Sequence, residues 1–351
     1  MKVVIRADAS VEIGMGHVMR CLTLACHLKE RGAEIWFMCV DMPGHLAAQI
    51  DALGMEMIWL TPAEALDLSV VRRAVASLAP FDLLILDSYG LDAAWESEIR
   101  SIAQTIMVID DLGRPHNCDV LLDQNYPSPI HNLYAARTPA DCELLFGPQY
   151  ALLRPEFATL RATSLWRPRS MVSRLLVFMG GSDPRNETSK VLRGIVGAKW
   201  MRVVVDVVIG TGNPYVRDIR AACADLPNAT LHIQTSRMAD LMAAADCAVG
   251  ASGSTTWERC ALGLPGLVTI LADNQAPIAE AVAAAGGHQL LGWYDRLTPE
   301  DYTAALLALD VNKLGSMSQA AARICDGRGA ERVAARLVAY PASSHRRNWA
   351  N

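Results

Sequence analysis

Residues 3–31 read VVIRADASVEIGMGHVMRCLTLACHLKER, in the order strand, glycine-containing turn and helix. Val3–Arg6 is a short β-branched run, and within Val18–Arg31 the apolar residues recur on one helical face until Gly32 ends the pattern. Similar strand-like runs alternate with Ala- and Leu-rich helical segments along most of the chain. This alternation predicts an α/β fold whose parallel sheets are covered by helices on both faces.

The length of 351 residues predicts two domains of this kind. The alternation pauses between Phe146 and Arg174, and we place the domain boundary there. We expect an N-terminal Rossmann-like domain over residues 1–148, a linker over 149–174, a C-terminal Rossmann-like domain over 175–338 and a tail over 339–351. The expected strands are Val3–Arg6, Glu34–Val40, Met57–Trp59, Leu83–Leu86, Ile106–Ile109 and Val120–Leu122, then Leu175–Met179, Val203–Ile209, Thr230–Ile233, Ala248–Gly250 and Gly266–Ile270.

The composition excludes several classes of protein. A formal net charge of −5 leaves no basic surplus to neutralise the phosphates of a nucleic acid. The nine cysteines include no C-x-x-C pair, so we expect reduced thiols. The histidines lack the spacing of metal ligands, and we expect neither a metal nor a cofactor. No apolar stretch approaches the ~18 residues of a membrane span, and Arg6 ends the first apolar run too early for a signal peptide. We therefore expect a cytoplasmic protein, with a monomer as its oligomeric state.

The turn after the first strand carries the sharpest chemical pattern. Gly14 and Gly16 allow a ligand to approach the backbone, and the helix that follows presents its positive end. The dinucleotide fingerprint G-x-G-x-x-G is absent, because residue 19 is Met. His17 lies in the first helical turn, where the helix dipole disfavours imidazolium, so we expect a neutral imidazole that can accept a proton. The alternative is a histidine that caps the helix or packs on the sheet.

Acidic residues follow two other strands of the first half. Asp87 precedes Ser88-Tyr89-Gly90, and Asp110-Asp111 follows Ile106–Ile109. Strand-end carboxylates of a parallel sheet face the ligand, so these groups are expected to orient His17 or to bind sugar hydroxyls. Capping of a turn or helix is the alternative for each of them, and a two-carboxylate glycosidase pair remains open.

Two glycine- and serine-rich turns in the second half predict a phosphate site. Gly180-Gly181-Ser182 follows one strand, and Gly253-Ser254-Thr255 opens a helix after another. Small residues leave backbone N–H groups uncovered, and the hydroxyls add donors. Glu258, one turn into that helix, is suited to accept hydrogen bonds from ribose hydroxyls, and Asn274-Gln275 projects amides after a further strand. A plain Ser/Thr capping segment is the alternative for the second turn.

These motifs resemble those of a known family. The residues concerned are Ile5–Ser10, Ile13–Leu22, Asp87–Tyr89, Phe178–Pro184 and Gly253–Glu258. They resemble the UDP-2,4-diacetamido-2,4,6-trideoxy-β-L-altropyranose hydrolases of pseudaminic-acid biosynthesis, and the likeness extends over most of the chain. The second half is also similar to the nucleotide-binding half of MurG-type GT-B glycosyltransferases.

The resemblance implies a GT-B fold and a metal-independent hydrolysis that inverts the anomeric carbon. The family's catalytic His falls on His17, which would deprotonate water, its Tyr falls on Tyr89 and its Asn on Asn274. UDP would lie along Gly253–Glu258, and the product would supply surface glycans, flagellin included. The predicted catalytic residues are Asp8, His17, Tyr89 and Asn274, and the predicted substrate-binding residues are Gly14, Gly16, Arg20, Gly180, Gly181, Ser182, Gly253, Ser254, Thr255, Glu258 and Gln275.

Two other functions fit the same residues. In a MurG-like glycosyltransferase, His17 would deprotonate an acceptor hydroxyl instead of water, so the release of UDP would require an acceptor. A non-catalytic nucleotide-sugar sensor would bind without turnover, and the presence of His17 argues against it. Should His17 not be the base, the acidic residues Asp8, Asp87 and Asp111 remain as candidates for that role.

Overall fold

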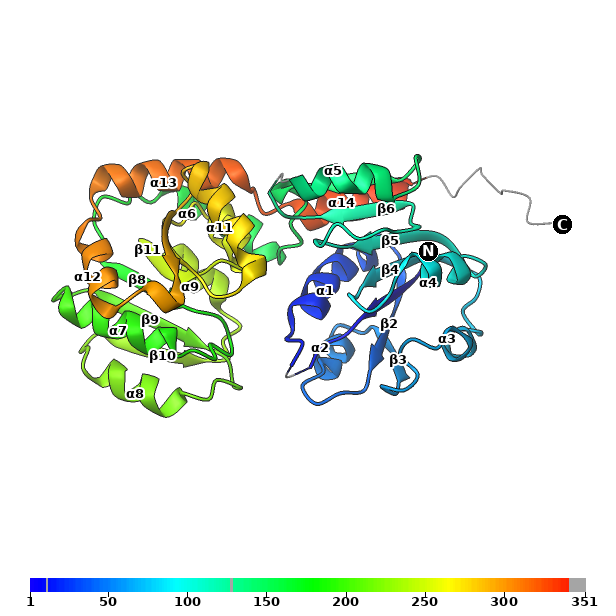
Figure 1. The fold of residues 1–351 in the computed structure, drawn as a ribbon, viewed down its shortest axis with the longest axis horizontal. Helices are drawn as coiled ribbons and strands as arrows, with labels where there is room; N and C mark the ends of the chain where they lie inside the picture. Colours follow the sequence, from blue (N-terminus) through cyan, green and yellow to red (C-terminus); the bar gives the residue numbers. More distant parts are fainter. Residues whose placement is uncertain (11, 127–128, 341–351) are drawn as a thin grey trace. The chain divides into compact units, whose positions relative to one another are not determined.

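The computed structural model describes residues 1–10, 12–126 and 129–340. The chain divides into two compact units: unit 1 contains Met1–Arg154 and the chain from Arg328 onward, and unit 2 is Pro155–Gly327. Each unit has one parallel sheet with helices on its faces (Figure 1). The prediction of an α/β fold with two parallel sheets is confirmed.

Unit 1 has a sheet of seven strands, all parallel to their neighbours. The strands are β1 (Lys2–Ala7), β2 (Glu34–Val40), β3 (Glu56–Leu60), β4 (Phe81–Asp87), β5 (Ala103–Ile109), β6 (Val120–Asp123) and β7 (Glu143–Phe146). Their order across the sheet is β3-β2-β1-β4-β5-β6-β7. All six strands expected in this half are present. The additional strand β7 was not predicted. It has four residues and directly precedes a Gly-Pro turn, so its short apolar run resembles the start of a linker.

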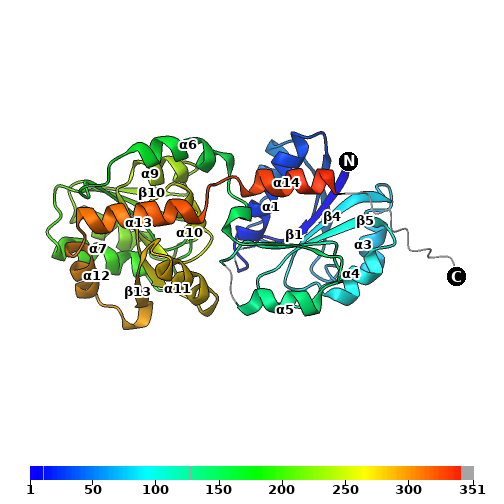
Figure 2. The same ribbon diagram turned by 90° about the horizontal axis from the view of Figure 1, so that it is seen from above.

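Successive side chains of each strand point to opposite faces of this sheet, and each face packs against its own set of helices. The helices of unit 1 are α1 (Gly16–Lys29), α2 (Ala47–Ala52), α3 (Leu68–Ala74), α4 (Ala93–Ile99), α5 (Pro129–Arg137), the 3₁₀ turn η1 (Pro148–Tyr150) and α14 (Gly329–Ala339). On β1, Val3 and Ile5 pack in one core cluster with α1, α2 and α14, whereas Val4 packs in another with α3, α4 and α5. Figure 2 shows these helices on opposite sides of the strands. Because both faces are buried, residues 3–5 of β1 form an unbroken apolar run.

Unit 2 has a six-stranded parallel sheet. The strands are β8 (Arg174–Phe178), β9 (Val204–Ile209), β10 (Ala229–Ile233), β11 (Cys247–Ala251), β12 (Gly266–Ile270) and β13 (Gln289–Trp293), and the sheet order is β10-β9-β8-β11-β12-β13. The helices are α6 (Pro155–Trp166), α7 (Glu187–Gly197), α8 (Val216–Ala224), α9 (Met238–Ala244), α10 (Thr255–Ala261), η2 (Asp273–Gln275), α11 (Ala276–Ala284), η3 (Tyr294–Arg296), α12 (Pro299–Leu307) and α13 (Val311–Ile324). The five strands expected in this half are present. The additional edge strand β13 is half-buried along its length and contains Gly292, so it lacks a strand-like alternation.

The last helix, α14, lies in unit 1 although it follows unit 2 in the sequence (Figure 2). Its residues Val333 and Leu337 pack in the same core cluster as Leu24 and Leu28 of α1. The structural division therefore differs from the expected boundaries in two places. The segment expected as a linker contains α6, which belongs to unit 2, and the end of the expected C-terminal domain belongs to unit 1. Amphipathic periodicity shows that a helix covers a core, but not which core.

Gly329→Ala tests the contact that holds α14 in unit 1. A Cβ atom at Gly329 would collide with the backbone of Tyr150 and Ala151, so the substitution is expected to destabilise the protein by about 1–3 kcal/mol. Gly315→Ala is the matched control, because a Cβ atom there meets nothing within 4 Å on α13. Replacing that helical glycine should stabilise by up to about 1 kcal/mol. Thermal unfolding of both variants measures the difference, and equal effects would contradict the close approach of α14.

Among the helices that the structure describes, none has the length and apolar character needed to cross a bilayer. The expected tail over residues 339–351 lies outside the described residues from residue 341 onward.

Candidate active site

In unit 1 the candidate residues gather where β1 and β4 end and α1 begins. The two strands are neighbours, and Ala7 pairs with Asp87 at their carboxyl ends. Between β1 and α1, Gly14 adopts φ +84° and donates its backbone N–H to the carbonyl of Ser10 at 2.8 Å. The residue before α1 makes no side-chain cap, and Cβ atoms on Gly14 and Gly16 would meet nothing within 4 Å. The turn therefore leaves room beside the uncapped first turn of the helix.

His17 forms a partly buried cluster with Asp87 and Arg20. His17 Nδ1 lies 2.6 Å from Asp87 Oδ1, and Arg20 donates from Nε to Oδ2 and from Nη2 to Oδ1, both at 2.6 Å. The Asp87 side chain is fully buried, whereas the His17 side chain is 16% exposed. Burial alone would raise the pKa of the Asp87 carboxyl, but Arg20 and His17 outweigh it and hold that pKa well below its usual range. Asp87 is therefore an ionised acceptor.

An ionised Asp87 determines how the imidazole of His17 carries its proton. The 2.6 Å contact is a hydrogen bond only if Nδ1 donates to the carboxylate, which leaves Nε2 of a neutral ring with a free electron pair. Arg20 Nη2 also lies 3.2 Å from Nδ1, but two groups that both carry hydrogen do not bond to each other. Asp87 is thus the residue that orients His17, a role that the sequence left open among several acidic residues.

Tyr89 follows Asp87 and faces His17. The two rings meet edge to face, with centroids 5.1 Å apart at an interplanar angle of 89°. The Tyr89 hydroxyl donates to Asp111 Oδ1 at 2.7 Å. Burial, followed by the charge of Asp111, raises the pKa of the Tyr89 phenol, so the hydroxyl stays protonated. Burial likewise raises the pKa of the Asp111 carboxyl. Tyr89 and Asp111 hence supply polar groups beside the imidazole.

Asp8, expected to contribute to catalysis, is engaged elsewhere. Its Oδ1 lies 2.6 Å from Nη1 of the buried Arg6 and accepts the backbone N–H of Val40 at 2.8 Å. The bond to Val40 joins the end of β1 to β2, its neighbour in the sheet. These contacts favour a structural role for Asp8, in which it neutralises the buried charge of Arg6.

Asp110, which the sequence singled out after β5, belongs to a second charged cluster whose other members the sequence did not reveal. Its buried carboxylate accepts from the hydroxyl of Tyr134 at 2.8 Å and from Arg114 Nε at 2.7 Å. His116 Nδ1 lies 2.7 Å from Glu96 Oε1, and its Nε2 lies 3.6 Å from Asp110 Oδ2. Burial would lower the pKa of His116, but the two carboxylates outweigh it and raise the pKa to about 9. The spacing of Asp110 and Arg114, four residues apart, was the available signal.

In unit 2 the turn after β8 approaches the turn after β9 closely. The backbone N–H of Gly210 donates to the carbonyl of Gly181 at 2.8 Å, and a Cβ atom on Gly210 would lie 2.9 Å from that oxygen. Gly180 adopts φ +98°, which favours glycine, and Ser182 is exposed. Asp183 then caps α7, because its carboxylate accepts two backbone N–H groups of that helix at 2.9 Å. Glycines are therefore required here by backbone geometry.

The turn after β11 lies over a buried cation that the sequence did not reveal. Gly253 and Ser254 lead into α10, and Ser254 makes no side-chain cap. The guanidinium of Arg259, one turn into the helix, donates to the carbonyl of Ala251 at 3.2 Å and approaches the Thr255 hydroxyl at 3.4 Å. Arg259 is 4% exposed, and burial lowers its pKa. The hydrogen-bond partners of this buried charge are the carbonyl of Ala251 and the hydroxyls of Thr255 and Thr256, which are neutral, so Arg259 adds to the turn a positive potential that suits an anion.

The remaining predicted residues of unit 2 lie on neighbouring elements. Glu258 is half-buried on α10, and η2 carries Asn274, which is exposed. Gln275 closes its own turn, because its Oε1 accepts the backbone N–H of Leu271 at 3.0 Å. The predicted residues of unit 2 therefore follow three adjacent strands, β8, β11 and β12, at their carboxyl ends. That edge is where ligands bind to open parallel sheets.

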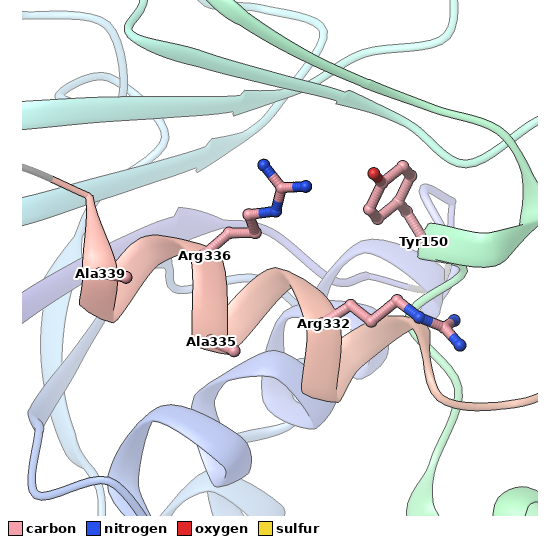
Figure 3. Close-up of a pocket in the computed structure, with 5 residues that line it drawn as sticks. All are labelled: Tyr150, Arg332, Ala335, Arg336 and Ala339. Carbon is pink, nitrogen blue, oxygen red and sulfur yellow. The ribbon is translucent and has the colours of Figure 1, made fainter.

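A pocket of about 360 Å³ elsewhere in unit 1 contains none of the candidate residues. Figure 3 shows its lining, with Arg332, Ala335, Arg336 and Ala339 along α14 and Tyr150 facing them. Arg332 donates to the carbonyl of Gln149 at 2.8 Å, and Arg336 donates to Glu143 Oε1 at 2.7 Å. The arginines serve to hold α14 in place. Within residues 1–10, 12–126 and 129–340, no three His, Cys, Asp or Glu side chains are placed to hold a metal ion.

Comparison with known proteins gives relatives of moderate identity. The chain is 26% identical to the uncharacterized protein MJ1062 of Methanocaldococcus jannaschii over 78% of this chain, which spans only 56% of that protein. It is 28% identical to the UDP-2,4-diacetamido-2,4,6-trideoxy-beta-L-altropyranose hydrolase of Campylobacter jejuni, over 69% of this chain and 81% of that enzyme. It is 27% identical to the spore coat polysaccharide biosynthesis protein SpsG of Bacillus subtilis, over 96% and 98%. No protein-family model matches the chain.

Solved structures share the fold. MurG of Acinetobacter baumannii superposes with a TM-score of 0.65 and 16% identity, over 97% of this chain and 100% of that chain. The UDP-GlcNAc 2-epimerase of Neisseria meningitidis gives a TM-score of 0.65 and 14% identity over the same shares. At these identities the likeness establishes the fold alone, which is GT-B as predicted.

Proposed function

We propose that the chain is an enzyme that hydrolyses a UDP-linked amino sugar, with UDP-2,4-diacetamido-2,4,6-trideoxy-β-L-altropyranose as its substrate. The observation that carries the proposal is the contact of 2.6 Å between His17 and the ionised Asp87, which leaves His17 Nε2 able to accept a proton. The similarity to the Campylobacter jejuni hydrolase supports the choice of substrate. In that case the free sugar supplies pseudaminic-acid synthesis and the glycosylation of flagellin.

The proposed reaction needs one base and one well-stabilised leaving group. His17 Nε2 takes a proton from water as the water oxygen attacks C1 of the sugar from the face opposite UDP. The bond between C1 and the β-phosphate oxygen breaks, and UDP leaves with the electron pair, so the anomeric carbon is inverted. The proton on Nδ1 stays on His17 and remains hydrogen-bonded to Asp87. The charge of Asp87 stabilises the imidazolium that forms, while Arg20 remains paired with Asp87. A diphosphate leaves as a stable anion and requires little protonation.

Unit 2 is proposed to bind the UDP part of the substrate. The turn Gly253-Ser254-Thr255 offers uncovered backbone N–H groups and hydroxyls, and the buried charge of Arg259 adds to their attraction for phosphate. Glu258 is assigned to the ribose hydroxyls. Gly180-Gly181-Ser182 contributes backbone donors from the neighbouring strand, and the amides of Asn274 and Gln275 are assigned to the sugar and its phosphate.

A glycosyltransferase is the second candidate. Its support is the fold, because MurG and several other glycosyltransferases are among the structural neighbours. In such an enzyme His17 would deprotonate an acceptor hydroxyl by the same geometry. The two functions differ in whether UDP is released when water is the only nucleophile.

Release of UDP without an acceptor separates these functions. Purified enzyme is mixed with the diacetamido UDP-sugar in the presence of a chelator, and UDP is measured by a coupled assay. Steady turnover with one sugar released per UDP supports the hydrolase, and proton NMR of the first product formed should show the inverted anomer. Absence of release under these conditions would favour the transferase or a non-catalytic sensor. UDP-N-acetylglucosamine serves as the specificity control and is expected to turn over far more slowly.

A further inference from the structure

A single guanidinium ties together the turn that carries Tyr89. Arg114 Nη1 donates to the carbonyls of Tyr89 and Leu91, both at 3.0 Å, and its Nη2 donates to the carbonyl of Ser88 at 3.3 Å. The same guanidinium lies over the Tyr89 ring, 5.6 Å from its centroid. Three carbonyls of one turn and the ring of its central residue therefore share one cation.

Asp110 holds that guanidinium from the other side. Its Oδ1 accepts from Arg114 Nε at 2.7 Å and lies 2.7 Å from Nη2, while Oδ2 accepts from the hydroxyl of Tyr134 at 2.8 Å. The Asp110 side chain is fully buried, and the Arg114 side chain is 24% exposed. The pair thus connects the end of β5 to the turn that follows β4, the neighbouring strand. Only a guanidinium, with its several donors in one plane, can make these contacts. The ammonium group of a lysine cannot reach the carboxylate and the three carbonyls at the same time.

The turn that Arg114 holds carries two groups of the candidate site. Asp87 ends β4 and bonds to His17, and Tyr89 lies edge to face against the same imidazole. Asp87 is fixed by the sheet and by Arg20, whereas Tyr89 is 45% exposed and lies outside the strand. Besides the ring contacts, the side chain of Tyr89 is anchored by the hydrogen bond from its hydroxyl to Asp111. The position of Tyr89 hence depends on the backbone of the turn.

We propose that Arg114, held by Asp110, is a positioning residue that fixes Tyr89 against His17 for the reaction. The inference rests on the proposed function, since it assigns Arg114 a part in the same site. Arg114 acts through Tyr89 and makes no contact with the substrate. Its loss should lower kcat by misplacing Tyr89, and it should leave the affinity for UDP unchanged because UDP is assigned to unit 2.

The experiment compares Arg114→Lys with Arg100→Lys. Arg100 is a matched control, because it donates from Nη1 to both oxygens of Asp119, at 3.0 and 2.8 Å, and from Nη2 to the carbonyl of Asn117. Its side chain is also 24% exposed. It joins the end of α4 to the start of β6 and does not contact the Tyr89 turn. Arg114→Lys is expected to lower kcat about tenfold or more with KM changed less than threefold, whereas Arg100→Lys should stay within about twofold of wild type.

A double variant shows whether Arg114 acts through Tyr89. Tyr89→Ala is expected to lower kcat by itself, and adding Arg114→Lys to it should lower kcat by less than about twofold more. Losses that multiply in the double variant would overturn the proposal, as would an Arg114→Lys enzyme with the kcat of wild type. Equal losses of kcat in Arg114→Lys and Arg100→Lys would also overturn it, because they would reflect general destabilisation.

Hydrogen exchange keeps the test independent of activity. In Arg114→Lys the amides of residues 88–91 should exchange faster than in wild type, while Arg100→Lys should leave them unchanged. If wild type releases no UDP, the proposed hydrolysis fails, but faster exchange confined to this turn still supports the positioning of Tyr89 by Arg114. Unchanged exchange in Arg114→Lys would overturn the positioning role, whatever the activity of wild type.

Discussion

His17→Ala is expected to lower the rate of UDP release at saturating substrate by about a hundredfold or more, with UDP affinity within about twofold of wild type. The geometry prepares His17 for this role, since Asp87 holds its Nδ1 and leaves Nε2 free to accept a proton. Removal of the ring removes general-base catalysis but leaves the groups assigned to UDP in unit 2. The measurement is initial UDP release together with a titration of UDP binding.

The matched control is His27→Ala on the same helix. His27 lies near the end of α1, with Nδ1 3.4 Å from Glu30 Oε2, and it belongs to none of the predicted site residues. It should keep the wild-type rate. Equal UDP release by His17→Ala and wild type would leave hydrolysis standing and move the base to Asp111. Asp8 and Asp87 are then disfavoured, because both are paired with arginine and burial keeps Asp87 from solvent.

Asp87→Asn is expected to abolish most of the activity for a different reason. An amide in place of the carboxylate removes the charge that stabilises the imidazolium, and its Nδ2 can hold His17 in the wrong tautomer. We expect a loss of kcat of about a hundredfold or more. The change also leaves Arg20 with a buried, unpaired charge, which costs on the order of 3–5 kcal/mol of stability. Activity must therefore be measured well below the unfolding temperature of the variant.

Unit 2 contains a matched cluster for this experiment. Asp206 is 2% exposed, lies 2.8 Å from His232 Nε2 and accepts from Arg174 Nε at 2.6 Å. Asp206→Asn should therefore lose stability in the same way, but it should retain kcat, because this cluster holds none of the predicted site residues. Similar losses of kcat in the two folded variants would contradict the specific role of Asp87. A loss of kcat in Asp87→Asn with unchanged UDP binding would support it.

Local patterns predicted most of the fold and the identity of several candidate residues. The β-branched runs located eleven strands of the two sheets, because burial on both faces demands continuous apolar residues. The glycine turn and the start of α1 were also readable, since a positive φ at Gly14 and helical periodicity after it are local properties. The short strands β7 and β13 were not predicted, because four or five residues of mixed burial give too weak a hydrophobic pattern.

The partners of the site residues depended on the order of strands. His17 and Asp87 are 70 residues apart in the sequence, and they meet because β1 pairs with β4 and not with β3. The pairing of β4 with β5 likewise brings Arg114 to the Tyr89 turn. No local pattern specifies which strands are neighbours, so nothing in the sequence indicated that Arg114 contacts the Tyr89 turn or that His116 contacts Glu96.

By itself the sequence determined that the chain is a two-sheet α/β protein with a histidine at the first turn of its first helix. These features arise from interactions among residues a few positions apart, which periodicity and glycine placement record directly. Only the tertiary structure decided that Asp87 orients that histidine and that α14 completes unit 1. Such choices depend on how distant apolar faces pack together, and many helices and strands have faces that are equally suited to be buried.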